Sequence, residues 1–120
     1  IARQIYSMPP AHGALLVSLI LGDDQLRSDW QTELEEVRLR IKSMRSLLTN
    51  GIQGNAAGID FSHIENQNGM FSFLGITSAQ LDRLREEFGI YIVSSTRVNL
   101  AGINSSNIGY INESINTVLK

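Results

Sequence analysis

The sequence predicts an α/β protein in which a small mixed layer of strands and helices packs against one long amphipathic helix. Two observations support this fold class. Apolar residues recur at steps of three and four over residues 26–48, which is the periodicity of a helix with one apolar face. Residues 68–120 then alternate between strand-like and helix-like patterns, in the order strand, helix, strand, strand, helix.

Two helices are expected in the first half of the chain. The apolar segment 13–22 predicts a short buried helix. Asp23 and Asp24 provide an N-cap for a longer helix over about 25–50. Its apolar stripe consists of Leu26, Trp30, Leu34, Val37, Ile41, Met44 and Leu48. Short coiled coils have the same spacing, so periodicity alone leaves open whether this helix lies on a core or pairs with a partner helix.

The second half begins with a predicted linker. Residues 49–58 are rich in glycine and small side chains, and the helix is expected to stop near Asn50 and Gly51. Residues 68–76 alternate as a strand does. A capping box at Thr77 and Gln80 predicts a helix that ends at the next glycine. Two further strands and a closing helix are expected over residues 89–95, 97–102 and 104–120.

Composition excludes several classes of partner. The 120 residues suffice for one domain with a core, and there is no cysteine. Ten basic and twelve acidic side chains give a net charge of −2, without a basic run that could follow nucleic acid. The apolar run 14–21 is far shorter than the roughly 20 residues of a spanning helix. We therefore expect a soluble, cytoplasmic protein with no nucleic-acid or membrane partner. Because Ile1 opens a segment without disordered character, the chain is expected to begin inside a larger protein.

The side chains for several kinds of catalysis are missing. His12 and His63 are far apart in sequence and have no cysteine partner, so no metal site is predicted. Covalent amine chemistry needs a lysine in a dry pocket. The only lysines are Lys42, on a solvated helix flank, and Lys120. We expect no catalytic residue in this chain.

Arg97 stands at the start of an apolar strand and requires an anionic partner. One candidate is a surface carboxylate from a nearby acidic residue, namely Asp82, Glu86 or Glu87. The other candidate is the carboxylate of a ligand, which the planar guanidinium could bind through two parallel hydrogen bonds. The residues around Arg97 leave both candidates open.

Four motifs in order resemble the C-terminal third of the class I, pyridoxal-phosphate-dependent aspartate and aromatic amino-acid aminotransferases of bacteria. They are "YSMPPAHG" (6–13), "NGMFSF" (68–73), "RLREEFGIY" (83–91) and "RVNLAGIN" (97–104). The resemblance implies the aspartate-aminotransferase-like fold of pyridoxal-phosphate transferases. It also implies that residues 1–24 finish the large domain, that 25–50 form an interdomain helix, and that 51–120 form most of the small domain.

The resemblance implies a role for four residues of this sequence. Arg97 is similar to the arginine that binds the substrate α-carboxylate in a bidentate manner. Arg3 is similar to an arginine that reaches across the dimer interface to bind the side-chain carboxylate of aspartate or glutamate. Ser7 resembles a serine near the cofactor phosphate, and Phe71 resembles an aromatic residue that lines the substrate pocket. Without the resemblance, Arg3 would be a frayed terminal residue and Phe71 a core side chain.

Two positions depart from the family pattern. Met8 replaces an asparagine beside the prolines that shape the loop of Arg3, so a polar contact is lost and apolar surface is gained. Thr96 stands where a glycine usually precedes the carboxylate-binding arginine. If that position requires a positive φ, threonine must strain the turn.

The function implied by the resemblance is transfer of an amino group between an aromatic amino acid or aspartate and 2-oxoglutarate. The cofactor would be pyridoxal 5′-phosphate, bound to a lysine that precedes Ile1, so the chain alone is expected to be inactive. The whole protein would be a homodimer. The alternative is a non-enzymatic association module in which the apolar stripe of residues 26–48 pairs with a partner helix.

Overall fold

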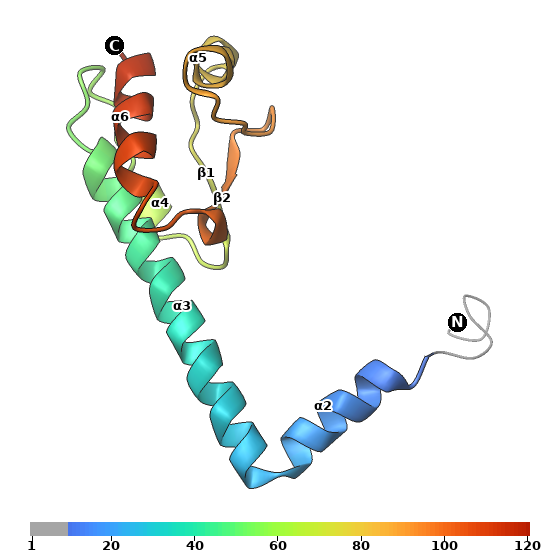
Figure 1. Ribbon diagram of the computed structural model, residues 1–120. Helices are drawn as coiled ribbons and strands as arrows, with labels where there is room; N and C mark the ends of the chain where they lie inside the picture. The colour runs from blue at the N-terminus through green and yellow to red at the C-terminus, as the bar shows by residue number, and fades with distance from the viewer. Residues whose placement is uncertain (1–9) are drawn as a thin grey trace. The chain divides into compact units, whose positions relative to one another are not determined.

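The structure is a computed structural model that describes residues 10–120 (Figure 1). Contacts divide the chain into two units between Arg38 and Leu39, inside one continuous helix. The elements in chain order are α2 (His12–Gly22), α3 (Asp24–Ile52), α4 (Ser62–Glu65), β1 (Phe71–Phe73), α5 (Ser78–Phe88), β2 (Arg97–Asn99), the 3-10 helix η1 (Leu100–Gly102) and α6 (Ile108–Val118). None of the helices in this part of the chain is both long enough and apolar enough to cross a membrane.

The first unit contains α2 and the beginning of α3. Both helices form where the sequence predicts them. Asp23 caps α3, because its Oδ1 accepts hydrogen bonds from the backbone N–H groups of Gln25 and Leu26, both at 2.9 Å. The expectation that α2 is buried is wrong for the described residues, since no side chain of α2 is buried. The helix is apolar on all sides, and residues 10–120 supply nothing that covers it.

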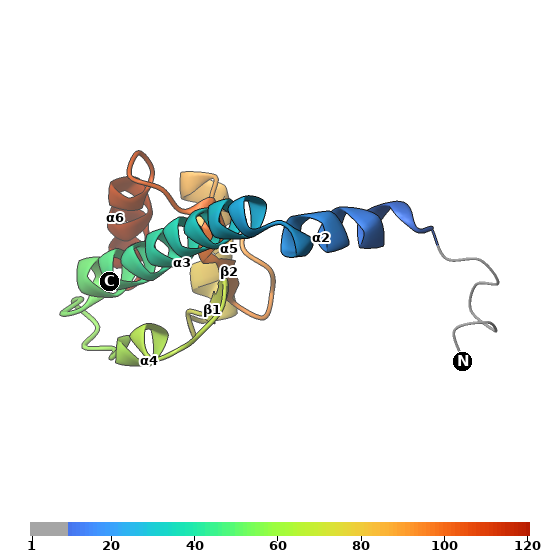
Figure 2. The same cartoon turned by 90° about the horizontal axis from the view of Figure 1, so that it is seen from below.

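The core of the second unit forms where the last turns of α3 meet α6, which lies beside them in Figures 1 and 2. Asn112 donates a hydrogen bond to the Leu47 carbonyl (3.2 Å), and Asn116 donates one to the Gly51 carbonyl (2.8 Å). A side chain at Gly51 would collide with Asn112, so this glycine permits the close approach. The predicted helix end near Gly51 is confirmed, since α3 ends at Ile52, which is fully buried.

Thirteen buried apolar residues form this core. They are Met44, Leu48, Ile52, Phe61, Ile64, Leu74, Ile76, Leu84, Leu100, Ile103, Ile115, Val118 and Leu119. The burial of the apolar stripe of α3 changes where the two units meet. Ile41 is half-buried and Met44 and Leu48 are buried, whereas the stripe residues before them are exposed. From Ile41 onward, α3 is thus a helix that lies on a core.

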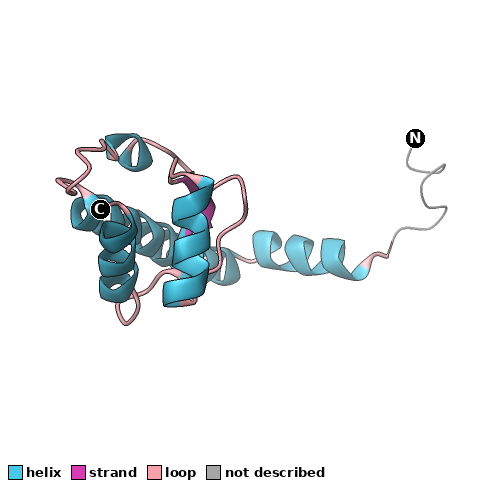
Figure 3. Cartoon of the chain, turned by 90° about the horizontal axis from the view of Figure 1, so that it is seen from above, coloured by secondary structure: helices cyan, strands magenta, loops and turns pink. Residues whose placement is uncertain are grey.

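The sheet has two antiparallel strands, β1 and β2, in the register Phe71↔Asn99, Ser72↔Val98 and Phe73↔Arg97. Figure 3 shows how short these strands are beside the helices. Both are shorter than predicted, and η1 replaces the second half of the expected strand 97–102. The expected strand 89–95 is wrong. Half-buried and exposed side chains do alternate over residues 90–93, but no described strand pairs with this segment, so no ladder forms.

The helix α5 confirms the local signals in the sequence. Thr77 Oγ1 accepts a hydrogen bond from the Gln80 N–H (3.3 Å), and Gln80 Oε1 accepts one from the Thr77 N–H (2.9 Å). Gly89 ends the helix in the left-handed conformation, with φ 63°. Tyr110 of α6 donates a hydrogen bond to the Phe88 carbonyl (2.7 Å), which links α5 to α6.

The short helix α4 was not expected, and it forms in the region that follows the predicted linker. The Asp60 carboxylate accepts hydrogen bonds from the Ser62 backbone N–H and from the Ser62 hydroxyl, both at 2.8 Å. These bonds, with a weaker one from Gln53, lower the pKa of Asp60 because they stabilise its ionised form. A single carboxylate therefore organises the start of α4.

Candidate functional site

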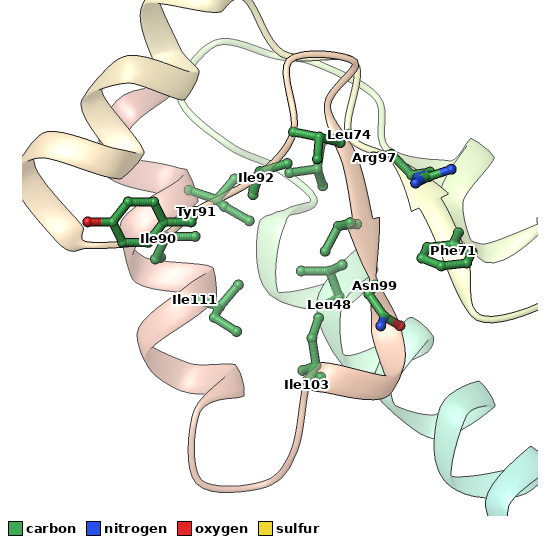
Figure 4. Close-up of a pocket in the computed structure, with 14 residues that line it drawn as sticks. Leu48, Phe71, Leu74, Ile90, Tyr91, Ile92, Arg97, Asn99, Ile103 and Ile111 are labelled. Carbon is green, nitrogen blue, oxygen red and sulfur yellow. The ribbon is translucent and has the colours of Figure 1, made fainter.

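Arg97 and Phe71 lie on the same exposed face of the two-stranded sheet. Arg97 is the first residue of β2 and is paired with Phe73, so Phe71 is its diagonal neighbour two residues along β1. The Arg97 guanidinium carbon lies 4.6 Å from the centroid of the Phe71 ring, within the range of a cation–π interaction. Figure 4 shows the two side chains next to each other, with Leu48, Ile103 and Ile111 on the other side of β2.

Phe71 is therefore not a core residue. Its side of β1 is exposed, and the residue itself retains 42% of its accessible surface. The core is filled from β1 by Ser72 and from the next segment by Leu74, which are 1% exposed each. The alternation along β1 puts the small serine inside and leaves the aromatic ring available to support the guanidinium of Arg97.

The guanidinium of Arg97 has no ion pair or hydrogen bond with any residue in the range 10–120. The acidic side chains of α5 pair instead with arginines of the same helix, in the ion pairs Arg83–Glu87 (2.6 Å), Arg85–Asp82 (2.8 Å) and Arg85–Glu86 (3.6 Å). The hydrogen bond from Arg83 lowers the pKa of Glu87. Within the described range, the donors of Arg97 are free to bind an anion through the planar fork.

The turn that precedes Arg97 is held in an unusual conformation. Thr96 has φ 62°, and it is the one residue other than glycine with a positive φ in the described part of the chain. The Thr96 carbonyl accepts a hydrogen bond from the Leu74 N–H (3.0 Å). Its hydroxyl accepts a second one from the Gly75 N–H (3.0 Å). The backbone at this position therefore has the positive φ that was considered in the sequence analysis, where the family pattern has a glycine.

An apolar cavity of about 350 Å³ adjoins this part of the sheet. Its walls come from α3, α6, β2 and the segment 90–93, and they include Leu48, Ile111 and Tyr91. Arg97 is the one charged residue among the described residues that line it. Its guanidinium is directed away from the cavity, on the side of β2 opposite Leu48 and Ile111, so the cavity is separate from the place where Arg97 could bind an anion.

Arg45 is a buried cation behind β1 that sequence reasoning missed. It is only 3% exposed. Its guanidinium donates hydrogen bonds to the carbonyls of Ile64 (2.8 Å) and Gly69 (2.7 Å) and to the hydroxyl of Ser72. Burial lowers its pKa, and all three acceptors are neutral. Arg45 thereby ties α3 to the end of α4, to the turn before β1 and to β1 itself.

Two of the predicted site residues fall in the part of the chain that the structure does not describe. Arg3 and Ser7 lie outside the described residues, as does Met8. Lys42 and Lys120 are exposed, and neither lines the cavity. The described residues therefore place an unpaired guanidinium at this site, but no lysine that could hold pyridoxal phosphate. They also contain no group of three or more metal-ligating side chains.

Comparison with known proteins identifies relatives along the whole chain. The family model "Aminotransferase class I and II" matches residues 1–115. The aspartate aminotransferase of Escherichia coli (strain K12) is 52% identical over 117 residues, which are 98% of this chain and 30% of that protein. The aromatic-amino-acid aminotransferase of the same organism is 43% identical over 106 residues, which are 88% of this chain and 27% of that protein.

Solved structures give the same result for the fold. An aromatic-amino-acid aminotransferase from Burkholderia pseudomallei, covalently bound to pyridoxal phosphate, matches with a TM-score of 0.92 at 47% identity. The match covers 98% of this chain and 30% of that chain. A mitochondrial aspartate aminotransferase from Trypanosoma brucei matches with a TM-score of 0.91 at 38% identity, covering 98% of this chain and 31% of that chain. The chain spans about 30% of the length of the curated relatives and has the aspartate-aminotransferase-like fold. It belongs to the class I and II aminotransferase family.

Proposed function

We propose that this chain is the substrate-carboxylate-binding part of an aminotransferase that moves an amino group between aspartate or an aromatic amino acid and 2-oxoglutarate. The observation that carries the proposal is the unpaired guanidinium of Arg97, which lies over the Phe71 ring within residues 10–120. The relatives named above support the reaction class, because they are aspartate and aromatic-amino-acid aminotransferases.

In this proposal, Arg97 binds the α-carboxylate of each substrate. Both the amino acid and the oxo acid carry this group, so one arginine serves both halves of the reaction. Two parallel hydrogen bonds from a planar fork fix the orientation of the carboxylate as well as its position. Phe71 limits the motion of the guanidinium from one side and excludes water from that face.

Pyridoxal phosphate is the proposed cofactor of the whole protein, supported by the family and by the neighbour that binds it. When bound, it supplies an electron sink for the reacting carbon, which no amino-acid side chain can supply. The described residues contribute substrate binding and orientation, and no step through the cofactor is derived from them. The proposal includes a cytoplasmic homodimer in which Arg3 and Ser7 reach the partner's site.

The test compares conservative variants of two arginines in the whole protein. Arg97→Lys keeps the positive charge but replaces the fork with a point charge, so one of two hydrogen bonds is lost. The expected fall in kcat/KM is roughly 100-fold, and it should be similar for aspartate, tyrosine and phenylalanine. Arg85→Lys is the matched control, because Arg85 is exposed and pairs only within α5; its kcat/KM should stay within about twofold of the original.

A variant of Arg3 separates the two proposed carboxylate sites. Arg3→Ala should reduce kcat/KM for aspartate far more than for phenylalanine, since only aspartate has a second carboxylate. Loss of one charge-assisted bidentate contact should cost on the order of 2–4 kcal/mol. If Arg97→Lys retained nearly full activity, or lost it for one substrate class only, the assignment of Arg97 would be wrong.

A further inference from the structure

We propose that Thr96 is a positioning residue: its hydroxyl holds the turn that aims Arg97 at the substrate carboxylate. The inference rests on the proposed function of Arg97. It starts from the strained backbone of Thr96, whose φ is 62°. A branched side chain in the left-handed region is unfavourable, and such residues persist only where their surroundings over-determine the conformation.

Three hydrogen bonds hold the backbone of Thr96 in this conformation. Its N–H donates to the Val93 carbonyl (2.8 Å), which closes the turn of residues 93–96. Its carbonyl accepts from the Leu74 N–H, and its hydroxyl accepts from the Gly75 N–H, both at 3.0 Å. Two of the three bonds therefore join the residue before β2 to the two residues after β1. They extend the sheet beyond the last paired residues, Phe73 and Arg97.

The hydroxyl bond matters for geometry more than for stability. Gly75 is exposed, so its N–H can bind water when the hydroxyl is removed, and little free energy of folding is lost. The backbone angle at Thr96, however, sets the direction in which Arg97 leaves the turn. A misplacement of about 1 Å in a group that positions substrate can cost on the order of 100-fold in rate. A small rotation at Thr96 is thus expected to weaken carboxylate binding without unfolding the turn.

Three substitutions at this position separate the hydroxyl from the strain. Thr96→Val keeps the branch and the strain but removes the acceptor. Thr96→Ser keeps the acceptor and removes a methyl group. Thr96→Gly removes the strain and the acceptor together, and it frees the backbone to adopt other angles. If only the backbone strain at Thr96 mattered, and not its hydroxyl, Thr96→Val would be the least stable variant and Thr96→Gly would bind the carboxylate best.

The experiment uses the holoenzyme of the whole protein and measures three quantities. They are kcat and KM for aspartate and for phenylalanine, the Kd of 3-phenylpropionate as a carboxylate that cannot react, and the Tm. For Thr96→Val we expect both KM values and the Kd to rise by a common factor of about 3 to 10, with a Tm change of at most ~2 °C. Thr96→Ser should stay close to the original protein, and Thr96→Gly should resemble Thr96→Val in binding.

Several results would overturn the inference. They are an unchanged KM and Kd in Thr96→Val, tighter binding in Thr96→Gly than in the original protein, or equal weakening in the serine and valine variants. If Thr96→Val does not fold, the serine and glycine variants still decide, because both tolerate a positive φ better than valine does. If Arg97→Lys also leaves activity unchanged, the proposed function fails. If Arg97→Lys is impaired and the variants of Thr96 are not, only the positioning role fails.

Discussion

Replacing Arg45 with methionine is expected to loosen β1 while leaving the packing of α3 in place. Methionine keeps the apolar length of the arginine stem, so the substitution removes the guanidinium with little change in volume. The three acceptors of Arg45 then lose their donor. Ser72 is 1% exposed, so water cannot readily replace the bond to its hydroxyl.

The magnitude follows from the hydrogen bonds. Bonds from a charged donor contribute about 1.5–3 kcal/mol each, and a buried acceptor left without a partner costs about 1–3 kcal/mol. Arg45 makes three such bonds, to Ile64, Gly69 and Ser72. The variant also avoids the desolvation of a buried cation, which offsets several kcal/mol of that loss. We expect a net destabilisation of about 2–4 kcal/mol, concentrated where the acceptors lie.

Amide hydrogen exchange of the whole protein measures this effect locally. The peptide that covers residues 70–76 contains the Leu74 N–H, which donates to the Thr96 carbonyl. Its protected amides should exchange roughly 30-fold faster or more in Arg45→Met, since every 1.4 kcal/mol is a factor of ten. Arg40→Met is the matched control, because Arg40 donates two longer bonds, to Ile103 (3.0 Å) and Ala101 (3.2 Å), from an exposed position. Unchanged or slower exchange in Arg45→Met would refute the reasoning and would show that desolvation outweighs the hydrogen bonds.

The remaining predictions concern helix starts. The pKa of Asp60 is lower in the folded protein than in the unfolded chain, so its contribution to stability is present above about pH 4 and is lost as the pH falls through the folded value. In the original protein, the amides around Ser62 should lose protection from hydrogen exchange as the pH falls from neutral to acidic, and in Asp60→Asn this loss should be smaller. The same pH dependence in both proteins would contradict this. Thr77→Ala should destabilise the protein by about 1 kcal/mol, measured by denaturant unfolding, because the Gln80 N–H loses its acceptor. Ser78→Ala, one residue into α5, is the control and should change stability by less than about 0.5 kcal/mol.

Signals contained within a few residues were predictive. The capping box of Thr77 and Gln80 and the glycine at position 89 determine where α5 begins and ends, and Asp23 determines where α3 begins. Each of these features depends on hydrogen bonds between residues at most four apart in sequence, or on a local φ. No distant part of the chain is needed to form them.

Signals that depend on distant residues were not predictive. The end of α3 near Gly51 was predicted, but the packing of α6 on that glycine, from 65 residues away, was not. The expected strand 89–95 failed because alternation predicts which side chains face the core, whereas a strand also needs a partner for its backbone. The helix α2 was predicted correctly, but within residues 10–120 nothing buries it, and amphipathicity cannot show what covers a helix that is apolar on all sides.

The candidate site, too, could be predicted only where the signal was local in the sequence. Arg97 could be singled out from a charge at the start of an apolar strand, and the family resemblance suggested Phe71. That the two side chains touch follows from the register of β1 and β2, which the sequence did not specify. No signal pointed to Arg45, because an arginine next to a stripe residue is normally solvated, and its three acceptors are brought together only by the fold.

The contacts of α6 also determine when the second unit can form during synthesis. Ile115, Val118 and Leu119 belong to the core, and Asn116 bonds to Gly51 across 65 residues of chain. At about 5–20 residues per second, a ribosome takes roughly 3–13 seconds to add that length. During this interval the apolar face of the last turns of α3 has no α6 to cover it. A nascent chain stalled before α6 should therefore be a substrate for chaperones, whereas release of α6 allows the core to close.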